Sequence, residues 1–413
     1  MISIKAPSIF LSAISVFLLL MISACSKSGS APEEIITPPT TVVLATISTS
    51  EVHTVTTIEA LGGGKVTNNG GASVVERGIV LSTSPNPTIE NTKFGTTSVS
   101  GDGSFATRFT GLSASTKYYV RAYAVNSAGI AYGNEVTFTT TMIGAATFAS
   151  SPLYIVGNSI AHWDVEVLTD GGGLITERGL CWGLTSNPTI DNNKATDGGN
   201  GTGKFRGSMT KLLPRTEYYV RAYAKNGKGI SYSNNVKFRT IGKGNLTYTF
   251  NKSSSPTSTE LEAYARLQTA IDSAVWYVNN YTSLAKHVWL NYDPGVATAD
   301  ANNEGWMRFG AGIGYQNLRT MLHELNHTFG TGTTNWWNGK IVGGKLQSAY
   351  VNDILNKIQS TTGVQLSGDR QHWWPFGLNQ NSEVTSSWDY VYNCLIIEQM
   401  RKDGLPAAGT WVE

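Results

Sequence analysis

The residues best suited to chemistry lie in segment 321–330, which reads Met-Leu-His-Glu-Leu-Asn-His-Thr-Phe-Gly. His323 and His327 are four residues apart, so on a helix both imidazoles leave the same face. That spacing lets two nitrogens reach one zinc ion at about 2.0–2.1 Å. Glu324 is placed to take a proton from a zinc-activated water and to pass it to a leaving amine. The segment therefore predicts a zinc site able to hydrolyse a substrate.

The flanks of this motif favour a metal site over two solvated histidines on an ordinary helix. A bare HExxH pattern also occurs by chance, so its surroundings must support it. Gly330 follows the second histidine by three residues, where a left-handed glycine can end the helix. The neighbouring positions are apolar, as a packed helix requires: Leu318, Met321, Leu322, Leu325 and Phe329.

Segment 323–330 resembles the zincin metallopeptidases, and its HExxHxxG pattern resembles the metzincin group in particular. That resemblance implies a third histidine six residues after His327, but Thr333 stands there. The third ligand must come from further along the chain. We expect His372, since imidazole suits zinc, with Glu383 or Glu398 as the alternatives. His372 could instead simply stack among Trp373 and Trp374.

A substrate cleft is expected beside the motif. In zincins an edge strand before the active-site helix pairs with extended substrate, and segment 306–309 is the expected equivalent. Tyr315, Tyr390 and Tyr392 are open candidates for stabilising an oxyanion. Tryptophans in Gly- and Asn-rich loops also stack on sugars, so a glycan or glycoprotein substrate stays open alongside peptide. The aromatic residues that could line the cleft, or alternatively form core, are Trp306, Phe309, Trp336, Trp373 and Trp374.

The elements around the motif predict an α+β domain over residues 245–413. Apolar residues at helical spacing indicate a helix over 258–281. The whole region resembles a family of secreted bacterial zincin-type domains, which implies the fold and the metal but little about specificity. The other expected elements are strands over 287–292 and 306–309, a helix beginning near Tyr315, a helix over 349–360 and a last helix carrying Glu398.

Two repeats precede this domain. Tyr118-Tyr119-Val120-Arg121-Ala122-Tyr123-Ala124 recurs as Tyr218-Tyr219-Val220-Arg221-Ala222-Tyr223-Ala224, about a hundred residues later. Short alternating runs between turn sequences predict immunoglobulin-like β-sandwiches. The Leu-to-Tyr corners ending at Tyr118 and Tyr218 resemble fibronectin type III domains, in which the Tyr hydroxyl bonds back to the backbone. We therefore expect two such all-β modules, over 42–141 and 142–241.

Nothing in the repeats identifies a binding site. We expect them to act as spacers, with glycan or protein binding as the alternative. His53 and His162 have no evident partners and are expected at the surface. Cys181 and Cys394 lie in different predicted domains, so two buried free cysteines are expected rather than a disulfide.

The N-terminus resembles that of a bacterial lipoprotein. Residues 9–22 form an apolar run too short for a comfortable membrane span. It ends in Ile22-Ser23-Ala24-Cys25, which resembles a lipobox, and this implies that Cys25 is lipidated and becomes the first mature residue. We expect a signal peptide over 1–25 and a flexible tether over 26–41. The resemblance therefore predicts a lipid-anchored protein at the outer membrane or surface of a Gram-negative bacterium.

Composition adds broad limits. The chain has 413 residues, a net charge of +2 and 15% charged residues, so several domains are expected and nucleic acid is not an expected partner. We expect a monomeric, lipid-anchored zinc metallopeptidase acting on extracellular protein or glycoprotein. One alternative is an adhesion lipoprotein that binds glycan or protein through a non-catalytic zinc domain. A second alternative is a purely adhesive surface protein in which the HExxH motif is accidental.

Overall fold

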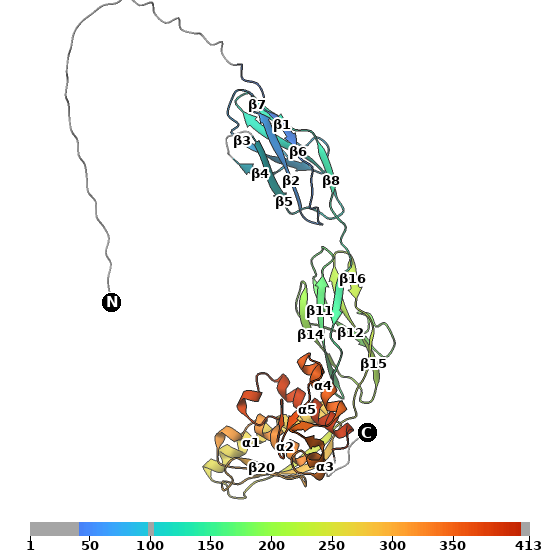
Figure 1. Cartoon of the computed structure of the whole chain (residues 1–413), viewed down its shortest axis with the longest axis vertical. Helices are drawn as coiled ribbons and strands as arrows, with labels where there is room; N and C mark the ends of the chain where they lie inside the picture. Colours follow the sequence, from blue (N-terminus) through green and yellow to red (C-terminus); the bar gives the residue numbers. More distant parts are fainter. Residues whose placement is uncertain (1–40, 98–102, 406–413) are drawn as a thin grey trace, which may run out of the picture.

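The computed structural model describes residues 41–97 and 103–405. Two β-sandwich modules are followed by a domain of mixed helices and strands (Figure 1). Cys25, the apolar run before it and residues 26–40 of the expected tether lie outside the described residues. Among the described helices, none is both long and apolar enough to cross a membrane.

Module 1 packs a three-stranded sheet, β1-β2-β5, against a sheet of order β4-β3-β6-β7 in which β8 also pairs with β6. The backbone N–H of Ser113 donates to the hydroxyl of Tyr118 at 2.9 Å, which confirms the predicted corner. The pairing is that of a fibronectin type III-like sandwich. The strands are β1 (Thr46–Thr49), β2 (Ala60–Asn68), β3 (Glu76–Ser82), β4 (Thr92–Thr97), β5 (Gly103–Phe109), β6 (Lys117–Asn126), β7 (Gly129–Tyr132) and β8 (Val136–Thr139).

Module 2 repeats this plan. One sheet contains β10-β11-β14 with β9 on β11, and the other contains β13-β12-β15-β16 with β17 on β15. Leu213 N–H donates to the Tyr218 hydroxyl at 3.0 Å, as at the corner of module 1. Its strands are β9 (Thr147–Ser150), β10 (Ile155–Val156), β11 (Ile160–Thr169), β12 (Glu177–Gly183), β13 (Asn193–Thr196), β14 (Gly203–Thr210), β15 (Glu217–Asn226), β16 (Gly229–Tyr232) and β17 (Val236–Arg239).

The C-terminal domain has a four-stranded sheet of order β18-β19-β21-β20. The first three strands run parallel, and β20 pairs antiparallel with β21. The expected helix over 258–281 is confirmed as α1, which begins with a Thr257–Glu260 capping box. The elements are β18 (Asn245–Asn251), α1 (Ser258–Tyr281), β19 (Ala285–Tyr292), β20 (Ala299–Ala301), β21 (Trp306–Phe309), the 3-10 turn η1 (Ile313–Tyr315) and α2 (Leu318–Thr328).

The edge of this sheet differs from our expectation. Segment 306–309 forms β21, which lies between β19 and β20, so predicting it as the edge strand was wrong. The two edge strands are β18 and β20, and β20 is the one that packs beside α2. A three-residue strand carries almost no periodic signal, so the sequence pattern alone could not reveal β20.

The rest of the domain is a small sheet, β22-β23-β24-β25, with three more helices. β24 and β25 pair as a hairpin whose turn carries His372. The helix expected over 349–360 is confirmed as α4. The elements are α3 (Asn335–Lys340), β22 (Ile341–Val342), β23 (Lys345–Leu346), α4 (Ala349–Gln359), β24 (Ser367–Gly368), β25 (Trp373–Trp374), the 3-10 turn η2 (Asn381–Glu383) and α5 (Trp388–Lys402).

Module 2 and the C-terminal domain share a packed junction. Ile155 of β10 belongs to the hydrophobic core of the C-terminal domain. His162 is 6% exposed, and its Nε2 lies 2.9 Å from the hydroxyl of Tyr281 at the end of α1. The expectation that His162 lies at the surface was therefore wrong, whereas His53 is exposed as expected. Cys181 and Cys394 are free and buried, as predicted.

Candidate metal and catalytic site

Helix α2 presents the two motif histidines on one face. The Asn317 side chain caps its start by accepting from Thr320 N–H at 3.1 Å. The predicted end is confirmed, since Gly330 has a φ of 111° just beyond the last helical turn. The opposite face is anchored in the core by Met321, Leu322 and Leu325, all fully buried. The orientation of the histidines is therefore set by burial of the apolar side of the helix.

Backbone carbonyls determine which nitrogen of each ring carries a hydrogen. Nδ1 of His323 lies 2.9 Å from the carbonyl oxygen of Gly377, and Nδ1 of His327 lies 2.8 Å from that of Thr331. A carbonyl oxygen can only accept, so each Nδ1 must be the donor. Each Nε2 then carries a lone pair, and the two Nε2 atoms lie 3.3 Å apart.

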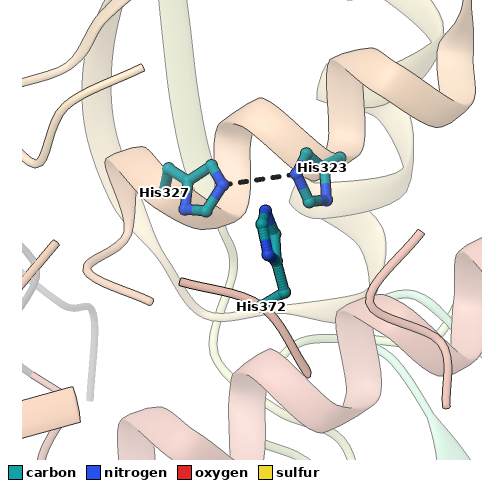
Figure 2. Close-up of side chains that lie close together, drawn as sticks. All are labelled: His323, His327 and His372. Carbon is teal, nitrogen blue, oxygen red and sulfur yellow. Dashed lines mark hydrogen bonds between the residues drawn. The ribbon is translucent and has the colours of Figure 1, made fainter. Parts of the chain in front are cut away.

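A third imidazole converges on this point (Figure 2). The candidate ligand atoms of His323, His327 and His372 all lie within 4.8 Å of one another. Asp369 shapes the hairpin turn, since its Oδ1 accepts from Gln371 N–H at 2.7 Å and from His372 N–H at 2.6 Å. The structure thus brings together the three histidines expected from the sequence, although they come from two separate parts of the chain.

The two helical histidines are electrically neutral. Burial lowers the pKa of His323 to about 3, and the nearby His327 ring adds to the shift. Burial also lowers the pKa of His327. Neutral imidazoles at physiological pH have the protonation state that metal binding requires.

Glu324 lies beside the histidines in a buried position. It is 4% exposed, and within the described chain its Oε2 has no hydrogen-bond partner. Burial raises its pKa to about 8, and the negative charge of Asp300 adds to the rise while Arg319 opposes it. A carboxylate with a free oxygen and a raised pKa is suited to proton transfer.

The alternative ligands are engaged elsewhere. Glu398 is 2% exposed and accepts hydrogen bonds from Ser283, and Arg401 pairs with it at 3.1 Å. Glu383 accepts from the backbone N–H of Leu378 and from the side chain of Asn379, both at 2.8 Å. Neither carboxylate belongs to the cluster formed by the three histidines.

A cleft of about 340 Å³ opens over the histidines. One wall is β20, and the floor is α2. Thr333 lines the cleft, and its hydroxyl donates to the carbonyl of His327 at 2.8 Å. The lining residues are Thr298, Ala299, Asp300, Ala301, Tyr315, Arg319, Thr320, His323, Glu324, His327, Gly332, Thr333, Gln371, His372 and Asn379.

The aromatic lining expected from the sequence is wrong for this cleft. Phe309 and Trp373 are buried in the core at 0% and 2% exposure. Trp336 donates to the carbonyl of Asp403 at the end of α5. Trp306 borders a neighbouring hollow that shares Asp300 and Ala301 with the cleft. The ring centroid of Trp374 lies 6.4 Å from that of His372, and Trp374 is not among the residues that line the cleft. Of the three tyrosines considered, Tyr315 lines the cleft.

Sequence reasoning missed Asp300, Arg319 and Asn379. Arg319 had a usable signal, because it precedes His323 by four residues and so shares the helix face of both histidines. Asp300 had none, since only strand pairing brings β20 to the cleft. Asn379 is in the loop that the sequence associated with His372, but it carries no motif of its own.

Comparison with known proteins adds only general likeness. No protein-family model matches the chain, and no curated protein sequence does. One similar solved structure is the sensor domain of the anti-sigma factor RsgI4 from Pseudobacteroides cellulosolvens, 17% identical over 25% of this chain and 99% of that one, with a TM-score of 0.21. The FN1–FN3 domains of chicken CNTN1 are 14% identical over 48% of this chain and 68% of that one, TM-score 0.21. Domains A168–A170 of titin are 17% identical over 48% of this chain and 67% of that one, also with a TM-score of 0.21.

Proposed function

We propose that the C-terminal domain is a zinc-dependent hydrolase that cleaves peptide bonds in extracellular protein or glycoprotein. His323, His327 and His372 hold the zinc ion, and Glu324 moves the proton. The observation that carries this proposal is the convergence of three imidazoles beside a buried carboxylate that has a free oxygen within the described chain. Two solvated histidines on an ordinary helix would have neither companion.

The donor atoms suit zinc. Two nitrogens bound to one tetrahedral zinc at about 2.0–2.1 Å are about 3.3 Å apart, and the two helical Nε2 atoms are 3.3 Å apart. Both point lone pairs at the same place, because their Nδ1 atoms donate to carbonyls. A three-histidine site also leaves one coordination position open, which is the pattern of catalytic zinc sites.

Glu324 has the position of a general base. Zinc in such a site supplies Lewis-acid activation of water near neutral pH. The Oε2 of Glu324 takes the proton of the attacking water, since this oxygen has no other partner among the described residues. The protonated carboxyl then returns that proton to the nitrogen of the departing amine.

Strand β20 provides a surface for the substrate. It is one of the two edge strands of the sheet, and its three residues all line the cleft. An extended peptide can add to such an edge through main-chain hydrogen bonds. This pairing would hold the cleaved bond above α2, which supports a peptide over a compact small molecule.

Zinc analysis and peptide hydrolysis test the proposal together. The full chain should bind one zinc ion and cleave casein or a mixed peptide library. Glu324→Gln should keep the metal but lose activity about a hundredfold or more, as removal of a general base does. His372→Ala should lose metal and activity, while His287→Ala, an exposed histidine on β19, should change neither. Equal cleavage by wild type and Glu324→Gln would remove Glu324 from the mechanism.

A glycan-binding role has one observation in its favour. Trp306 is 44% exposed and stacks on Trp289 at 5.1 Å, beside a hollow that shares Asp300 and Ala301 with the cleft. Aromatic faces of this kind can hold sugar rings. A glycan-binding role would be supported if the Glu324→Gln variant binds oligosaccharide and the double variant Glu324→Gln with Trp306→Ala does not. Binding that survives Trp306→Ala would exclude this surface.

We also propose that the protein is anchored at the outer membrane or cell surface through a lipid on Cys25. The support is the lipobox-like sequence before that cysteine. Cells expressing the wild type should incorporate labelled palmitate into the protein and retain it in the membrane fraction. Cys25→Ser should do neither. Membrane retention of the unlabelled serine variant would contradict the lipid anchor.

A further inference from the structure

Arg319 is a buried cation in the wall of the metal cleft. It is 7% exposed, it lines the cleft, and it lies one helical turn before His323 on the same face of α2. Its Nη1 donates to the carbonyl of Leu378 and its Nη2 to the hydroxyl of Thr320, both at 2.8 Å. Its Nε is buried without a partner in the described chain.

No carboxylate in the described residues forms an ion pair with Arg319. The guanidinium has five N–H groups and a permanent positive charge, yet its observed partners are a carbonyl and a hydroxyl. Buried charges are normally paired, because removing an ion from water is costly. An unpaired cation in a cleft is therefore suited to a partner that arrives with the substrate.

Two of the three carboxylates nearest Arg319 are held by other groups. Asp300 pairs with Arg308, with Oδ2 2.6 Å from Nη2. Glu383 accepts from Leu378 and Asn379 instead of reaching Arg319. Glu324 lines the cleft as the proposed base and makes no ion pair with Arg319. Glu383 and Glu324 therefore attract the charge of Arg319 only from a distance, and neither forms an ion pair with it in the described part of the chain.

A second unpaired polar atom lies in the same wall. Asn379 lines the cleft, and its Oδ1 is buried without a partner among the described residues. Its Nδ2 is held by the carbonyl of Trp373 and by Glu383, so the orientation of the amide is determined. The wall thus offers a cationic donor, which suits a carboxylate, and a neutral acceptor, which suits an amide N–H.

We propose that Arg319 is a specificity-determining residue that binds a carboxylate of the substrate, so that cleavage occurs beside an acidic side chain or a free C-terminus. The proposal rests on the hydrolase function given above and names its substrate class. The planar guanidinium suits carboxylates, because it can donate two parallel hydrogen bonds. Both sources of the carboxylate have the same chemistry, and the experiment separates them.

Arg319 could instead only position the loop. Its bond to Leu378 lies next to Gly377, whose carbonyl accepts from His323. A positioning role would change the cleavage of every peptide by the same factor. A carboxylate-binding role would change acidic peptides selectively, so the ratio between matched substrates distinguishes the two.

The test compares peptide pairs with the zinc-loaded full chain. In the first pair both peptides have an amidated C-terminus, and they differ only in carrying Asp or Asn at one internal site. In the second pair both peptides have neutral side chains, and they differ only in having a free or an amidated C-terminus. In one of the two pairs, wild type should cleave the peptide that carries the carboxylate with a kcat/KM about tenfold or more above that of its neutral partner, as expected for a charge-assisted hydrogen bond. Arg319→Gln should abolish that preference, and Arg319→Lys should retain part of it. Lys357→Gln, which removes a charge from the surface of α4, should leave it unchanged.

Binding gives a readout independent of turnover. The Glu324→Gln variant should bind the preferred acidic peptide about tenfold more tightly than its neutral partner by calorimetry, and adding Arg319→Gln should remove the difference. Cleavage without any charge preference in wild type would overturn the carboxylate proposal and leave the hydrolase intact. Charge-dependent binding without cleavage would refute the hydrolase and retain the carboxylate site. If Arg319→Gln fails to fold, the ratio of kcat/KM values within each peptide pair, measured on wild type, decides whether a carboxylate is preferred. The absence of both cleavage and binding in wild type overturns the proposal.

Discussion

The Nε2 atoms of His323 and His327 lie 3.3 Å apart, and both are acceptors because each ring donates through Nδ1 to a backbone carbonyl. Two lone pairs that face each other repel unless a cation lies between them. The carbonyls of Gly377 and Thr331 thus fix the orientation of the two rings, which is the orientation that the proposed zinc ion requires.

Zinc should stabilise the folded protein. A ligand that binds only the native state at a hundred times its Kd adds about 2.7 kcal/mol, so zinc should raise Tm by several degrees and a chelator should reverse the rise. Differential scanning fluorimetry measures both. His323→Ala should abolish the zinc-dependent shift, while the exposed His287→Ala should keep it. A full shift in His323→Ala would mean that zinc binds elsewhere.

Replacing Gly330 with alanine should weaken the proposed zinc site through the backbone. Gly330 has a φ of 111°, which an L-residue rarely adopts, so we expect a loss of about 1–2 kcal/mol in unfolding free energy. The strain falls next to Thr331, whose carbonyl orients His327, so zinc affinity should also fall. Chemical denaturation and metal titration measure the two effects. Gly339→Ala in α3, where an added Cβ has open space, should affect neither.

Lys286 should make stability rise with pH. It is 6% exposed, donates to the carbonyls of Asn303 and Thr328, and has its pKa lowered by burial to about 8. In the unfolded chain the pKa is about 10.4, so between pH 8 and 10.4 the unfolded state binds more protons. Stability should therefore increase by about 2 kcal/mol from pH 7 to 9.5, measured by urea unfolding.

The matched variants isolate this effect. Lys286→Met should show a smaller increase in stability over the same pH range than wild type. Lys357→Met, on the surface of α4, should behave like wild type. An identical pH dependence in Lys286→Met and wild type would assign the increase to other groups.

Acid should loosen the junction between module 2 and the C-terminal domain. Burial lowers the pKa of His162 to about 4, the charge of Arg206 lowers it further and Asp164 opposes the shift. Because the unfolded pKa is about 6.5, the unfolded state binds more protons as pH falls from 6.5 to 4. About 3 kcal/mol should be lost across that window, seen as faster proteolysis near residue 242.

His162→Gln should remove this pH-dependent loss, because its amide does not titrate. His53→Gln, at an exposed site in module 1, should behave like wild type. Unchanged acid sensitivity in His162→Gln would show that the junction responds through another group.

Much of the architecture follows from local sequence. The apolar spacing of 258–281 and its Thr257–Glu260 cap determine a helix without help from distant residues. The same holds for the two helical histidines, since a four-residue interval puts both rings on one face in any α-helix. The repeated Tyr corners likewise predicted two similar sandwiches.

Tertiary structure decided what depends on long-range contacts. Only sheet pairing makes β20 an edge strand and brings Asp300 to the cleft, because a three-residue strand has no pattern to recognise. Burial of Phe309 and Trp373 and the contact between His162 and Tyr281 likewise join segments far apart in the chain. The position of a hairpin turn likewise places His372, and neither Glu383 nor Glu398, in one cluster with the two helical histidines. Sequence spacing determines which side chains share a helix face, but the packing of separate elements decides what that face meets.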